Sequence, residues 1–138
     1  MNRSVAWTSM AVGIATGLVM GLWSFDGPVP VPAWLGEYGD TPRRLARLGH
    51  IAFLGLGILN LLLDHELPRS GLGARGKRVA AWAMNLGNIA LPMGLFAAAA
   101  WAPAKYALSI PATAVFVALT LVAWGARPTP RGSPEVHP

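Results

Sequence analysis

The chain alternates between long apolar runs and short polar segments. Four runs contain no Asp, Glu, Lys or Arg, at residues 5–23, 48–63, 79–104 and 106–126. About 20 apolar helical residues cross the ~30 Å hydrocarbon layer of a bilayer, and these runs have roughly that length. None of the runs shows the period-2 alternation of a barrel strand, and lipid admits only helices and closed barrels as spanning structures. The pattern therefore predicts an all-α integral membrane protein.

The same pattern predicts a bundle of four transmembrane helices joined by short loops. We expect these helices at about residues 5–23, 42–64, 78–101 and 105–125. Thr41 followed by Pro42 favours a helix start, with the Thr41 hydroxyl as the N-cap and Pro42 as the first helical residue. We interpret residues 1–126 as one transmembrane domain. Residues 127–138 are rich in proline and are predicted to form a disordered tail.

Composition agrees with a membrane location and excludes several kinds of site. Hydrophobic residues make up 54% of the chain and charged residues 12%, whereas soluble domains carry about 25% charged residues. The net charge is +5, with Lys and Arg at the ends of the apolar runs. Attraction to anionic lipid headgroups explains this placement, so we expect no nucleic-acid partner. The chain has no cysteine, which excludes disulfides, thiolate metal sites and a cysteine nucleophile.

Gly13, Gly17 and Gly21 form a GxxxGxxxG stripe on the first predicted helix. Residues four apart lie on one helix face, and missing side chains let another backbone approach closely. Three glycines weaken a helix in water by about 1 kcal/mol each relative to alanine. Keeping them favours a tightly packed helix pair, here called a glycine zipper. The neighbour is either another helix of this chain or a docking partner.

Arg43, Arg47 and His50 form the most unusual group of side chains in the chain. At 100° per residue they fall within about 60° on the second predicted helix. The arginines crowd a helix N-terminus, where the helix dipole disfavours cations. We therefore expect one common anionic neighbour: a lipid phosphate, the carboxylates of Glu37 and Asp40, or the acidic group of a bound ligand such as a haem propionate.

His50 is a candidate cofactor ligand because ionisable residues inside a membrane are often functional. A haem with two histidine ligands cannot be built, since His65 lies 15 residues along the same predicted helix, or about 22 Å away. Met20 is expected at a similar depth, so a His/Met pair is the remaining geometry. One histidine near an interface is a poor haem site, and no cofactor is predicted. Haem remains the alternative.

Asn85 and Asn88 share a face of the third predicted helix with Pro92. Pro92 cannot donate to the Asn88 carbonyl, which is therefore freed. Asn60 on the second helix and Thr8 on the first are expected at the same depth. We predict that these polar groups satisfy one another by hydrogen bonds between helices.

The sequence carries no recognisable catalytic spacing, no metal-binding cluster and no acidic residue inside a span. The expected function is that of a small accessory or scaffold subunit, with the lipid bilayer and other membrane subunits, or a second copy, as partners. A redox or ligand-binding membrane protein of haem or quinone type, centred on Arg43, Arg47 and His50, is the alternative.

We predict a bacterial-type plasma membrane location with both termini in the cytoplasm, because Lys and Arg favour that side. With four spans, one side holds Arg3, Arg69, Arg75, Lys77, Arg78, Arg127 and Arg131, and the other holds Arg43, Arg44, Arg47 and Lys105. Reporter fusions after Pro138 and within residues 27–34 should report opposite sides. An external reporter at Pro138 would contradict this orientation.

Overall fold

The computed structural model describes residues 2–24 and 26–126, and the predicted disordered tail lies outside these residues. The described part is helical and contains no strand. The helices are α1 (Asn2–Gly21), α2 (Thr41–Glu66), α3 (Ala74–Ala100) and α4 (Ser109–Gly125), with the 3-10 helices η1 (Ala33–Leu35) and η2 (Ala102–Leu108). Four spans are long and apolar enough to cross a membrane, the fourth combining η2 and α4. This confirms the predicted all-α class with four candidate membrane-spanning helices.

The observed helix ends differ from the predicted ones by up to four residues. The first and third helices begin earlier than predicted, at Asn2 and Ala74. Residues 102–108 form the 3-10 helix η2, so α-helical geometry begins at Ser109 rather than at 105. Pro111 lies in the first turn of α4, where its missing N–H costs no helical hydrogen bond.

The predicted N-cap of α2 is wrong. Asp40, not Thr41, occupies the N-cap position, and it forms no side-chain cap hydrogen bond. Its carboxylate Oδ2 instead accepts a hydrogen bond from the backbone N–H of Glu37 at 2.8 Å. This bond closes the turn that leads into α2. Pro42 is the second helical residue rather than the first, still within the turn that needs no N–H donor.

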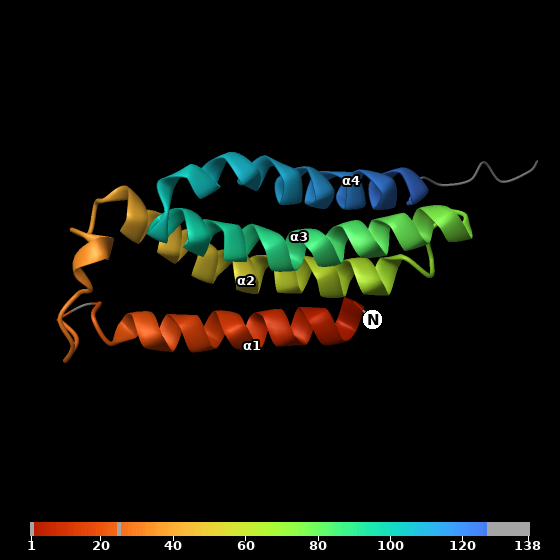
Figure 1. Cartoon of the computed structure of the whole chain (residues 1–138). Helices are drawn as coiled ribbons and strands as arrows, with labels where there is room; N and C mark the ends of the chain where they lie inside the picture. Colours follow the sequence, from red (N-terminus) through yellow and green to blue (C-terminus); the bar gives the residue numbers. More distant parts are fainter. Residues whose placement is uncertain (1, 25, 127–138) are drawn as a thin grey trace, which may run out of the picture.

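The four helices run antiparallel to their neighbours in the chain, with α2 and α3 at the centre (Figure 1). α1 packs mainly on α2, and α4 packs mainly on α3. α1 and α4 therefore lie on opposite sides of the central pair (Figure 1). Because α4 has one main neighbour, only Pro111 and Ala118 of this helix are buried.

Two apolar clusters hold the helices near opposite ends. Leu63 and Met84 belong to the larger cluster, which joins α2, α3 and α4. The smaller cluster joins Met20, Ala46 and Ala99 to Leu35 of η1, which is only 1% exposed. The long loop after α1 is thus anchored to the bundle through η1.

Close backbone approach joins each pair of neighbouring helices at one glycine. A Cβ atom on Gly57 would lie 3.0 Å from the carbonyl oxygen of Ala6, which joins α2 to α1. A Cβ atom on Gly49 of α2 would lie 3.2 Å from the Pro92 carbonyl oxygen of α3. One on Gly87 of α3 would lie 3.2 Å from the Pro111 carbonyl oxygen of α4. A larger residue at any of these glycines would push two helices apart.

Only two of the three glycines in the α1 stripe contact another helix. A Cβ on Gly13 would lie 2.9 Å from Leu54 Cγ, and one on Gly17 would lie 2.5 Å from His50 Cε1. These two glycines therefore pack against α2 of the same chain. Gly21 ends α1, and a Cβ there would meet nothing within 4 Å.

Gly17→Leu and Gly57→Leu should each lower stability by about 1–3 kcal/mol, because the added side chain overfills the α1–α2 contact. Gly55→Leu is the matched control, since Gly55 lies inside α2 with open space around it. Leucine has the better helix propensity at all three positions. Thermal unfolding of the purified variants in one detergent measures the difference. Equal stability of the three variants would contradict the packing described above.

Candidate functional site

Arg43 and Arg47 lie at the start of α2 and meet at one tyrosine of the preceding loop. The guanidinium carbon of Arg47 is 4.0 Å from the centre of the Tyr38 ring, and that of Arg43 is 5.4 Å away. Arg47 Nη2 donates to the Tyr38 carbonyl at 3.1 Å, and Arg43 Nη2 donates to the Trp23 carbonyl at 3.5 Å. The arginines thus tie the loop to α2 by cation–π contacts and hydrogen bonds to carbonyl oxygens.

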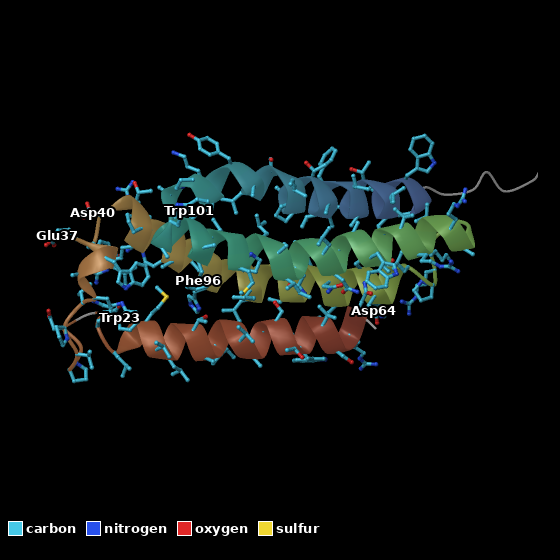
Figure 2. The ribbon with its side chains drawn as sticks, viewed as in Figure 1. Trp23, Glu37, Asp40, Asp64, Phe96 and Trp101 are labelled. Atoms are coloured by element: carbon cyan, nitrogen blue, oxygen red, sulfur yellow. The ribbon has the colours of Figure 1, made fainter. Side chains whose placement is uncertain are left out.

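Glu37 and Asp40 lie close to each other in the loop that leads into α2 (Figure 2). Among the described residues, neither carboxylate forms an ion pair with Arg43 or Arg47. The ring face and the two carbonyls supply partial negative charge in place of a carboxylate. A lipid phosphate or a partner's acidic group as the anionic neighbour remains a proposal.

His50 lies apart from the arginines, half-buried between α1 and α2. Its Nδ1 is 2.7 Å from the Gly13 carbonyl oxygen. A carbonyl oxygen only accepts, so Nδ1 carries the proton in this bond. The ring fits there because Gly17 has no side chain. The structure therefore does not bring His50 to the neighbour that Arg43 and Arg47 share.

Three asparagines from three helices form a hydrogen-bonded chain inside the bundle. Asn60 Nδ2 of α2 donates to Asn85 Oδ1 of α3 at 2.9 Å. Asn85 Nδ2 donates to Asn2 Oδ1 of α1 at 2.9 Å, and Asn2 Nδ2 donates to the Ala81 carbonyl at 3.4 Å. All three side chains are at most 5% exposed. The chain connects α1, α2 and α3.

Ser9 forms a second polar junction between the same helices. Its Oγ lies 2.9 Å from the Phe53 carbonyl of α2 and 2.9 Å from Asn88 Oδ1 of α3. One hydroxyl proton cannot serve both oxygens well, while Asn88 Nδ2 has no partner in this orientation. Rotating the Asn88 amide by a half turn lets Nδ2 donate to Ser9, which then donates to Phe53. Hydrogen-bond chemistry favours that rotamer.

Asn2 and Ser9 are the residues of α1 that bond to the asparagines and to α2, not Thr8 as predicted. Thr8 is exposed. The buried positions of α1 include Asn2, Ala6, Ser9 and Gly13, which follow a spacing of four, three and four residues. That spacing marks one helix face. The sequence signal for Asn2 and Ser9 is therefore their position on the same helix face as Gly13.

Four described cavities lie around the bundle, and His50 lines none of them. Two cavities of about 340 and 390 Å³ flank α1, are almost wholly apolar and share Val12. A third, of about 440 Å³, lies in the loop beside Tyr38 and Arg43. The largest, of about 610 Å³, lies at the opposite end and contains Arg3, Asp64 and Arg69. The cavities that contain charged side chains are therefore the 440 and 610 Å³ ones, and neither is next to His50.

No group of three or more His, Asp or Glu side chains within residues 2–24 and 26–126 is placed to hold a metal ion. Comparisons with protein-family models, curated proteins and solved structures found no match. The chemistry that the structure does display is hydrogen bonding between helices.

Replacing Asn85 by leucine should lower stability by about 1–2 kcal/mol, because Asn60 and Asn2 each lose a buried partner. Thr120→Val is the control, since the Thr120 hydroxyl is exposed and bonds only the Phe116 carbonyl of its own helix. Thermal unfolding in detergent measures both variants. An Asn85 variant as stable as the control would show that the asparagine chain contributes little.

Proposed function

We propose that this chain is a non-catalytic integral membrane protein that serves as an accessory or scaffold subunit of a larger membrane complex. The proposal rests on one observation: the buried polar side chains of α1, α2 and α3 bond to other helices. Asn2, Ser9, Asn60, Asn85 and Asn88 all hydrogen-bond across helices. Such bonds fix a rigid shape, which suits a scaffold that holds other subunits in place.

The outer face of α4 supports the proposal as a docking surface. Ile110 and Phe116 are 68% and 69% exposed on this helix. Ser109 and Thr113 follow the small-xxx-small spacing that favours helix contact in membranes. The Thr113 hydroxyl donates a hydrogen bond to the Ser109 carbonyl at 2.8 Å. Burying this hydroxyl against a partner helix would therefore leave no donor without an acceptor. A partner helix on this face would give α4 a second main neighbour besides α3.

A photo-crosslinking residue at Phe116, introduced at native expression, should yield a discrete protein adduct in intact membranes. Leu62 is the matched control, since it is 56% exposed but lies on α2. The mass of the adduct distinguishes another subunit from a second copy of this chain. Lipid adducts alone at both positions would contradict the proposal.

The alternative, a redox or ligand-binding protein, has one supporting contact. Because Nδ1 of His50 donates to Gly13, Nε2 is left as the free acceptor, the arrangement that metal-bound histidines use. Purification in mild detergent, with haem supplied and partners retained, tests it through a Soret band that His50→Ala abolishes. We expect a colourless preparation, and a Soret band that His50→Ala abolishes would favour the alternative.

A further inference from the structure

The largest described cavity lies where α1 begins and α2 ends. It has a volume of about 610 Å³, and its lining includes Arg3, Trp7, Asp64, His65 and Arg69. Asp64 lies at this end of the molecule, far from Glu37 and Asp40 (Figure 2). The cavity therefore belongs to the opposite membrane boundary from the Arg43 and Arg47 cluster.

Opposite charges share this cavity without neutralising each other. Among the described residues, no nitrogen of Arg3 or Arg69 lies within 4.0 Å of an Asp64 carboxylate oxygen. Arg69 is fixed by its Nη1, which donates to the His65 carbonyl at 2.8 Å. A guanidinium has five N–H donors, so four remain on Arg69. A purely anionic ligand would satisfy the arginines but leave Asp64 facing a like charge.

Apolar side chains continue from the cavity toward the middle of the membrane. On α1, Arg3, Trp7 and Ile14 fall within about 40° at 100° per residue. On α2, Leu61 and Ile58 fall within about 60°. Trp7, Ile14 and Ile58 are each more than half exposed. On α1, Arg3 thus shares a face with Ile14, and on α2, Leu61 lies within about 60° of both Asp64 and Ile58. The aliphatic side chains form a surface that extends from the cavity.

We propose that this cavity binds the headgroup of a zwitterionic phospholipid that carries a primary ammonium. The phosphate contacts Arg3 and Arg69, the ammonium contacts Asp64, and the acyl chains lie along the aliphatic surface of α1 and α2. Guanidinium groups bind phosphate through paired N–H donors, and an ammonium gives a carboxylate charged N–H donors. Trp7 suits the headgroup level, where indole rings concentrate.

The test measures the lipid that the purified protein retains. The protein is equilibrated with equal amounts of phosphatidylethanolamine, phosphatidylglycerol and phosphatidylcholine of the same acyl chains, and native mass spectrometry counts the bound lipid. The wild type should prefer phosphatidylethanolamine. Asp64→Asn should lower its ratio to phosphatidylglycerol by about threefold, the size expected for an exposed ion pair. Arg3→Gln with Arg69→Gln should reduce the binding of all three lipids.

Two variants and one competitor serve as controls. Asp64→Glu keeps the carboxylate and should keep the preference, which separates charge from folding. Arg78→Gln removes an exposed cation that is outside the cavity and should leave the ratio unchanged. Equal retention of the three lipids by the wild type, or an unchanged ratio in Asp64→Asn, overturns the proposal. Displacement by excess inorganic phosphate also overturns it, because it would identify a site for free anions.

Discussion

Helices surrounded by lipid gain little from hydrophobic attraction, so hydrogen bonds and close packing must hold them together. In this chain both act where α1 meets the central pair of helices, α2 and α3. Asn2 and Ser9 bind α1 to the central pair, and the glycine contacts at Gly17 and Gly57 let α1 approach closely enough for those bonds to form. An interhelical hydrogen bond contributes about 0.6 kcal/mol on average, so several are needed. The position of α1 depends on this set.

The apolar runs sufficed to predict helix number, type and rough position, because hydrocarbon thickness fixes the length of a span. The contacts between side chains were harder to predict. They depend on how each helix is rotated about its axis, and the length of an apolar run does not determine that rotation. Thr8 and Ser9 differ by one residue, yet one is exposed and the other buried. The one-residue difference turns a side chain by about 100°.

A pattern on one helix also does not show which segment covers it, as the group of Arg43, Arg47 and His50 illustrates. The three residues do share a face of α2, but different segments cover that face along its length. The loop brings Tyr38 to the arginines, whereas α1 brings the Gly13 carbonyl to His50. A spacing pattern describes one helix, and only the fold determines which neighbour meets each turn.

The bond between Asn2 and Asn85 spans 83 residues of sequence, which has a consequence for biogenesis. Chains emerge from the ribosome N-terminus first, so α1 becomes available to the bilayer before α3, which carries its asparagine partner. When α3 arrives, acceptors and donors on α1 and α2 are already present to receive Asn85 and Asn88. α3 therefore brings its two buried asparagines into the membrane after the helices that carry their hydrogen-bond partners.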